Sequence, residues 1–206
     1  MRIVWYALLV LLVAGQAVNA ADKDSNEPNV PNDPNNPQKL LQTTWDAIVS
    51  VLNKKDVEQE VKEKEIFKII NPIFDFQLMA QLALSRTHWP KLNKSEHERF
   101  LRLFTERLKS SYLNKVMLYT NEEIIFKDTT QDKKKNTINI PVDLVSKEKK
   151  VNMLYKLRKV EKRWKIYDVE IQGVSILLTY RAQFDDILSK GTVKDLLTQL
   201  EKPPEP

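Results

Sequence analysis

The residue types that carry nucleophilic or metal chemistry are scarce in this chain. Its 206 residues include two histidines, His88 and His97, three glycines and no cysteine. Neither histidine belongs to a metal-binding spacing such as H-E-x-x-H, and we interpret both as residues in or beside helices. The stretch Gly173-Val174-Ser175 lacks the second glycine of the G-x-S-x-G nucleophile motif. We therefore predict that the protein is not an enzyme and that it needs no metal and no cofactor.

Basic residues gather in three clusters, each in a stretch where we expect a hairpin turn. One interpretation is that the clusters are solvated turns that keep strand edges soluble. The other is a positive rim that meets an anionic membrane or an acidic partner. Because turns between alternate strands project at the same end of a meander, two of the clusters can be neighbours. The three clusters are Lys133 to Lys135, Lys147 with Lys149 and Lys150, and Lys159 with Lys162 and Arg163. The partner-docking candidates are Lys147, Lys149, Lys150, Lys162 and Arg163.

The first 38 residues have the composition of a targeting segment followed by a spacer. Arg2, an apolar run and a small-residue site ending at Ala20 are typical of a secretory signal peptide, so we predict cleavage after Ala20. A retained membrane anchor is the alternative. Residues 21–38 are rich in Asn, Pro and Asp, which predicts a disordered tether. The formal net charge of +5 is mildly basic and does not predict binding to nucleic acid.

The rest of the chain, residues 39–206, is predicted to form a single α+β domain. The helical spacing of apolar residues predicts helices over residues 40–52, 56–70, 73–89 and 96–119. Ser95 and Glu98 are expected to form a capping box before the last of these helices. Alternation of apolar and polar residues predicts antiparallel strands over residues 122–128, 136–146, 150–159 and 163–172. Helices followed by strands indicate a fold in which the helices pack over one face of a meander.

The stretch after the last predicted strand changes from strand to helix. Gly173 is expected to turn the chain, and Ser175 to cap a helix over residues 176–190 that ends at Gly191. The strand-like alternation at its start is then interpreted as a coincidence of a short window. Thr192 is expected to begin a short final helix.

Large apolar side chains are the remaining material for a binding site. The long helix and the strands carry more of them than a small meander needs: Tyr112, Met117, Tyr119, Met153, Tyr155 and Trp164. An ordinary hydrophobic core is the default interpretation, because composition alone does not locate a pocket.

Three motifs resemble the toluene-tolerance or MlaC-type family of periplasmic phospholipid-binding proteins from Gram-negative bacteria. They are FDFQLMAQLAL from Phe74 with Trp89 downstream, RWKIYDVEIQGVSILLTYRAQF from Arg163, and a terminal LLTQL. The resemblance covers nearly the whole chain beyond the tether. Ser85 stands where the family usually has glycine, which bears on where that helix ends, and Ala182 stands where the family often has serine.

The resemblance implies helices over a curved antiparallel sheet, with an apolar cavity between them that holds the tails of a diacyl phospholipid. It also implies a soluble periplasmic carrier, expected to be monomeric. Such a carrier exchanges lipid with an ABC transporter complex at the inner membrane and a lipoprotein complex at the outer membrane, which maintains outer-membrane lipid asymmetry. The candidate tail-contacting residues are Phe76, Met79, Phe104, Leu108, Tyr112, Met117, Tyr119, Val142, Leu144, Met153, Tyr155, Trp164, Ile166 and Ile176.

The physics of lipid transfer agrees with the absence of a catalytic set. Two acyl chains carry on the order of 20 kcal/mol of apolar burial, so a carrier needs an apolar cavity of its own. Three alternatives remain. One is an exported adaptor or structural module with a solid core. Another is a carrier of a different amphiphile such as a hopanoid. The third is an esterase or lipase with an unrecognised site.

Overall fold

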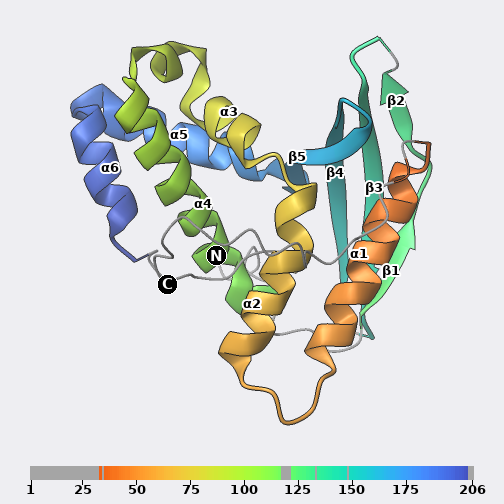
Figure 1. Cartoon of the computed structure of the whole chain (residues 1–206). Helices are drawn as coiled ribbons and strands as arrows, with labels where there is room; N and C mark the ends of the chain where they lie inside the picture. The colour runs from red at the N-terminus through yellow and green to blue at the C-terminus, as the bar shows by residue number, and fades with distance from the viewer. Residues whose placement is uncertain (1–32, 34, 117–121, 133, 148, 204–206) are drawn as a thin grey trace.

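The computed structural model has an antiparallel sheet with helices over one face, which is the predicted α+β class (Figure 1). It describes residue 33 and residues 35–116, 122–132, 134–147 and 149–203. The predicted signal peptide and most of the tether lie outside the described residues, as do Met117 and Tyr119. The helices are α1 (Pro37–Leu52), α2 (Gln59–Ile70), α3 (Phe76–His88), α4 (Lys94–Val116), α5 (Ile176–Lys190) and α6 (Val193–Glu201). Two short 3-10 helices are η2 (Asn71–Ile73) and η3 (Trp89–Lys91).

The sheet is antiparallel, in the order β1-β3-β4-β5-β6, with β2 also paired to β3. Its strands are β1 (Glu123–Phe126), β2 (Thr130–Asp132), β3 (Thr137–Val145), β4 (Lys150–Val160), β5 (Arg163–Ile171) and β6 (Val174–Ser175). β1 and β2 share one edge and are separated opposite Pro141, whose carbonyl accepts a hydrogen bond from the Lys127 amide at 3.0 Å. Proline has no N–H to continue that ladder, which explains the gap between the two strands. The sequence did not predict β2 or β6.

The predicted alternation of the long strands is confirmed. Ile138, Ile140, Val142 and Leu144 of β3 are buried, and so are the alternate residues of β4. The register between β4 and β5 shifts after Lys156, which leaves Tyr167 as an extra residue in β5. Such a bulge increases the local twist of a sheet.

Two helices begin earlier than predicted, because their caps lie earlier. α1 begins at Pro37, where the Asn36 side chain accepts from the Lys39 amide at 2.9 Å. α4 begins at Lys94 rather than after Ser95. The capping box predicted for Ser95 and Glu98 is wrong. The reciprocal bonds join Asn93 and Glu96, at 2.9 and 3.0 Å. Asparagine is as good an N-cap as serine, so both registers fit the pattern.

The turn from β5 into α5 follows the prediction. Gln172 and Gly173 both have positive φ, as a two-residue type I′ hairpin requires. The Ser175 hydroxyl caps α5 by accepting from the Leu178 amide at 3.1 Å. The strand pattern at the start of this stretch is real over two residues, since Val174 and Ser175 form β6. Gly191 does end the helix, but with φ of −147° it is extended rather than left-handed.

The helices form two groups (Figure 1). α1 lies over the inner face of the sheet, with α2 beside it. α3, α4, α5 and α6 form a second group, here called the helical lobe. Its interior holds the aromatic cluster of Phe100, Phe104, Tyr180 and Phe184. The predicted apolar face of α4 is confirmed, because Phe100, Phe104, Leu108 and Tyr112 are all buried.

Candidate functional site

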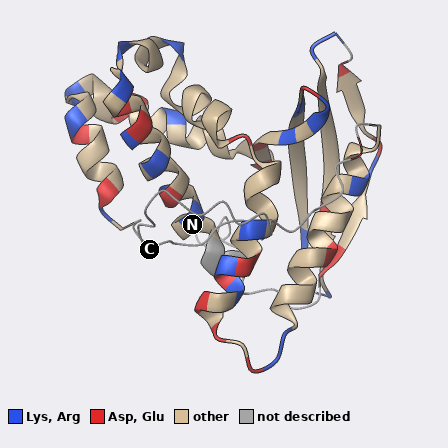
Figure 2. Cartoon of the chain, in the orientation of Figure 1, with Lys and Arg blue, Asp and Glu red and all other residues tan. Residues whose placement is uncertain are grey.

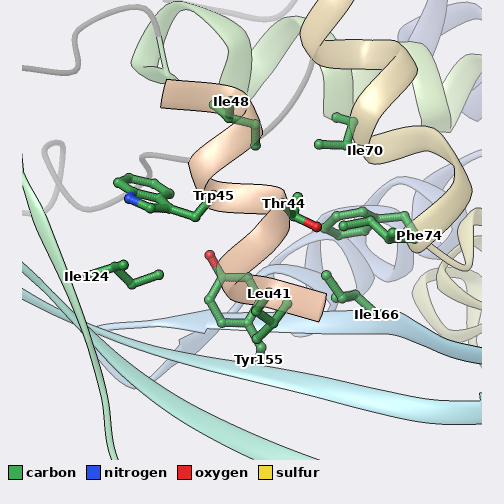
Figure 3. Close-up of a pocket in the computed structure, with 10 residues that line it drawn as sticks. Leu41, Thr44, Trp45, Ile48, Ile70, Phe74, Ile124, Tyr155 and Ile166 are labelled. Carbon is green, nitrogen blue, oxygen red and sulfur yellow. The ribbon is translucent and has the colours of Figure 1, made fainter. Parts of the chain in front are cut away.

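A small cavity lies between α1 and the inner face of the sheet (Figure 3). Its volume is about 20 Å³, which is room for about one water molecule. It is enclosed by side chains from α1, from the end of α2 with η2, and from β1, β4 and β5. The lining residues are Leu41, Thr44, Trp45, Ile48, Ile70, Ile73, Phe74, Ile124, Tyr155 and Ile166.

The roof of the cavity is the apolar face of α1. Leu41, Thr44, Trp45 and Ile48 are spaced three or four residues apart, so they share one side of the helix. All four are buried. The Thr44 hydroxyl donates to the Leu40 carbonyl at 2.7 Å, which satisfies its donor within the helix. The roof therefore presents hydrocarbon to the space beneath it.

The floor comes from the sheet. Tyr155 of β4 and Ile166 of β5 point toward α1 (Figure 3). Tyr155 is 5% exposed, and burial raises the pKa of its hydroxyl far above the ordinary value. No hydrogen bond of the described residues involves that hydroxyl, and its oxygen is open to the cavity, because no fully buried side-chain oxygen of the described residues lacks a partner. It is directed into the cavity and is the one polar feature of this wall (Figure 3).

Buried carboxylates elsewhere in the fold are paired, and they serve the architecture. Asp75 caps α3 by accepting from the Leu78 amide at 3.1 Å, and it also accepts from the Arg158 guanidinium at 2.6 Å. Asp168 accepts from the Ser175 hydroxyl at 2.8 Å and the Leu177 amide at 3.3 Å. The two aspartates of the sequence motifs thus fix where α3 and α5 leave the sheet.

A third buried carboxylate, Asp143, lies on the outer face of the sheet. Burial raises the pKa of Asp143, but hydrogen bonds from Lys127, Lys150 and Asn152 outweigh it and bring the pKa to about 2. Each of these three contacts is 2.7 Å long. The described residues contain no group of three or more His, Asp or Glu side chains placed to hold a metal ion. None of the described helices has the length and hydrophobicity needed to cross a bilayer.

The structure places the predicted tail-contacting residues differently relative to the cavity. Tyr155 and Ile166 line the cavity, and Phe76 is half-buried and stacks on Phe74, with ring centroids 5.7 Å apart. Met117 and Tyr119 lie outside the described residues. The others are buried in the core and do not line the cavity: Met79, Phe104, Leu108, Tyr112, Val142, Leu144, Met153, Trp164 and Ile176.

Sequence reasoning missed the α1 wall. The predicted tail contacts on helices include Phe104, Leu108 and Tyr112 of α4, but the cavity residues on the helical side belong to α1, α2, η2 and the residue after it, Phe74. The apolar face of α1 was visible in the sequence at helical spacing. Which helix would lie on the sheet was not, because periodicity identifies a buried face but not what it packs against.

The docking candidates lie at opposite ends of the sheet. Lys147 and Lys149 lie in the turn between β3 and β4, and Lys150 is the first residue of β4 and forms an ion pair with Asp143. Lys162 and Arg163 lie at the other end, where the Lys159 amide donates to the Asn136 carbonyl at 2.8 Å. That bond makes the first and third basic clusters neighbours. The neighbouring clusters form a basic end of the sheet (Figure 2), made of Lys134, Lys135, Lys159, Lys162 and Arg163.

Comparison with known proteins gives three findings. Residues 42–202 match the family described as MlaC protein. The intermembrane phospholipid transport system binding protein MlaC of Haemophilus influenzae is 26% identical over 120 residues, which are 56% of this chain and 56% of that protein. The match therefore spans about half the length of that relative.

The third finding is a similar solved structure. It is a phospholipid-binding protein from Ralstonia solanacearum in complex with a phospholipid. The TM-score is 0.71, with 78% of this chain and 92% of that chain covered, and the two sequences are 21% identical. This likeness establishes a shared fold.

Proposed function

The chain belongs to the MlaC protein family, and we propose that it binds a phospholipid by enclosing its acyl chains between α1 and the sheet. One observation carries the proposal. The cavity between these elements is walled by hydrocarbon from α1, η2 and three strands, with no charged side chain among its lining residues. Such a wall suits lipid tails and suits neither a phosphate nor a catalytic set. The Haemophilus relative, a phospholipid transport system binding protein, and the Ralstonia structure, a phospholipid-binding protein, support this ligand class.

The cavity must enlarge to receive a lipid. At about 20 Å³ it is much smaller than an acyl chain, so α1 and the sheet have to separate. Each methylene that enters contributes roughly 0.8 kcal/mol of burial. A diacyl lipid therefore offers enough favourable free energy to offset the loss of contacts between α1 and the strands. In this proposal the observed arrangement is the closed form of the site.

The proposal extends to transport across an aqueous compartment. We infer that the signal peptide is removed after Ala20 and that the mature protein carries phospholipid through the periplasm. Its expected partners are an ABC transporter complex at the inner membrane and a lipoprotein complex at the outer membrane, and its expected effect is to maintain outer-membrane asymmetry. The name of the Haemophilus relative, which places it in an intermembrane phospholipid transport system, supports this role.

The two lysine-rich ends of the sheet are the proposed docking surfaces for these partners. The basic end can meet an acidic surface, because opposite charge steers association at low salt. Its test is lipid transfer with Lys162 and Arg163 reversed to Glu, beside a second variant with Lys147 and Lys149 reversed. A lower transfer rate for a variant at low salt, with no difference from the parent at high salt, supports docking. Unchanged transfer rates at low salt would support the interpretation of the clusters as solvated turns.

The direct test of the function is the lipid content of the protein. The chain with its leader should be expressed in a Gram-negative host and purified from the periplasm without detergent, and its organic extract analysed by mass spectrometry. We expect about one diacyl phospholipid per molecule. Absence of any lipid would support the adaptor alternative. A hopanoid or another amphiphile would keep the carrier role and change its cargo, and turnover of the lipid would indicate an esterase.

A further inference from the structure

The hydroxyls of two buried tyrosines, Tyr180 and Tyr155, have different surroundings. In the helical lobe, the Tyr180 hydroxyl donates a hydrogen bond to the Ser111 hydroxyl at 3.2 Å. Under α1, Tyr155 is only 5% exposed, and no hydrogen bond of the described residues involves its hydroxyl. The described residues have no fully buried side-chain oxygen without a partner, so this oxygen is open to the cavity rather than sealed within the protein. It points into the cavity, toward α1 on the side of Trp45 (Figure 3). A buried tyrosine hydroxyl usually has a hydrogen-bond partner, so this one calls for an acceptor inside the cavity.

We propose that the Tyr155 hydroxyl donates a hydrogen bond to an ester carbonyl oxygen of the bound lipid. The inference rests on the proposed function, and it names the part of the lipid that reaches this depth. A tail lying across the hydroxyl would displace water and leave the O–H without an acceptor, which is unfavourable in an apolar site. An ester carbonyl placed next to the Tyr155 hydroxyl accepts its hydrogen bond.

The chemistry of the walls excludes the other acceptors of a phospholipid. A phosphate at this depth would be a buried charge, and the cavity-lining residues include no Lys or Arg to pair with it. The other polar side-chain groups of the lining are the indole N–H of Trp45 and the Thr44 hydroxyl, which already donates to the Leu40 carbonyl at 2.7 Å. Both are hydrogen-bond donors without charge, so neither compensates a buried phosphate. The neutral carbonyls at the junction of tails and glycerol remain as the acceptors that fit. The site should therefore favour ester-linked over ether-linked lipid.

The test compares Tyr155→Phe with the parent on two ligands that differ only in that carbonyl. Mature protein is delipidated and its affinity measured for a diacyl phosphatidylglycerol and for its dialkyl ether analogue. One hydrogen bond corresponds to a change of roughly 3- to 10-fold in affinity. We expect Tyr155→Phe to weaken diester binding by about that factor and to leave diether binding unchanged. Tyr167→Phe is the matched control, because Tyr167 is only half-buried and does not line the cavity.

Each other outcome contradicts the inference in a recognisable way. Equal weakening toward both ligands would make the hydroxyl a structural group. Unchanged or tighter diester binding by Tyr155→Phe would mean that the hydroxyl serves only a water molecule in the empty cavity. If Tyr155→Phe fails to fold, the parent's affinities for the two lipids are compared instead. A preference for the diester of roughly 3- to 10-fold supports the inference, and equal affinities contradict it. Failure of the parent to bind either lipid would instead refute the proposed function, so the two failures are distinguishable.

Discussion

The helical lobe and the contact between α1 and the sheet are both apolar, but they are packed differently. In the aromatic cluster of the lobe, ring centroids lie 5.3–5.8 Å apart, and the rings meet edge to face, stacked or tilted. Between α1 and the sheet, the side chains leave a cavity with the Tyr155 hydroxyl on its wall. The difference fits the proposed function, in which the lobe stabilises the fold and α1 separates from the sheet to admit a lipid.

The lobe is also closed by polar contacts at its rim. The Arg107 guanidinium on α4 donates to three carbonyls at the end of α6, those of Gln199 at 2.9 Å, Leu200 at 3.2 Å and Lys202 at 2.5 Å. These bonds satisfy carbonyls that a helix end leaves without partners. They hold α6 on α4, so the lobe should respond as one unit to a perturbation.

The largest effect should come from truncating the aromatic cluster. Phe104 is fully buried and contacts the rings of Phe100, Tyr180 and Phe184. Phe104→Ala should lower the free energy of unfolding by about 3–5 kcal/mol, measured by urea denaturation. Its control is Ile124→Ala on the half-buried wall of the cavity, with an expected cost of about 1 kcal/mol. Equal costs at the two sites would remove the contrast between the regions.

A smaller effect is expected where the lobe joins the sheet. The Ser175 hydroxyl accepts from the Leu178 amide and donates to Asp168, so it links α5 to β5. Ser175→Ala should cost about 1–2 kcal/mol of stability and leave lipid content unchanged. Ser189→Ala, at an exposed position of the same helix, should be close to neutral. A fully folded Ser175→Ala protein without lipid would show that Ser175 contacts the ligand instead.

The smallest effect is a gain, at a strained residue of the lobe. Ser85 has φ of 63° and ψ of 170°, at a kink in α3. That region of backbone conformation is essentially restricted to glycine and costs other residues of order 1–3 kcal/mol. Ser85→Gly should therefore stabilise the protein by about 1 kcal/mol, after the entropy of glycine in the unfolded chain offsets part of the relief. A lower melting temperature for Ser85→Gly would show that the side chain is needed there.

Local features of the fold were predictable because they depend on neighbours in the sequence. The turn at Gly173, the cap at Ser175 and the alternation of β3 each follow from a few adjacent residues. The cap of α4 was misplaced for the same reason, since Asn93 with Glu96 and Ser95 with Glu98 are equally good patterns. The gap between β1 and β2 required knowing that Pro141 would face that edge.

The candidate site was less predictable, because it depends on which elements meet. Tyr155 and Ile166 were identified from strand alternation, which fixes the inner face of a sheet. Leu41 and Ile48 were identified only as one face of a helix. Pairing that face with β4 requires the path of the whole chain, which no local pattern contains. Phe104 and Leu108, also predicted as tail contacts, are buried in the helical lobe and do not line this cavity, so their contact with a lipid stays a prediction.

The measurement that tests this account most directly places the same bulky residue in each region. Ile48→Trp fills the cavity under α1, and Leu108→Trp overpacks the lobe; both parent residues are 1% exposed. The readouts are the melting temperature and the phosphorus content per mole of folded protein. We predict that Ile48→Trp remains stable and loses most of its lipid. If α1 and the sheet can separate to admit an acyl chain, they can also separate to admit an indole ring, which then occupies the space of the lipid.

Leu108→Trp should lose about 1–3 kcal/mol of stability and keep its lipid, because the lobe has no room reserved for a ligand. The reverse result, a destabilised Ile48→Trp protein with full lipid content and a stable, lipid-free Leu108→Trp protein, would place the lipid site in the helical lobe and contradict the account.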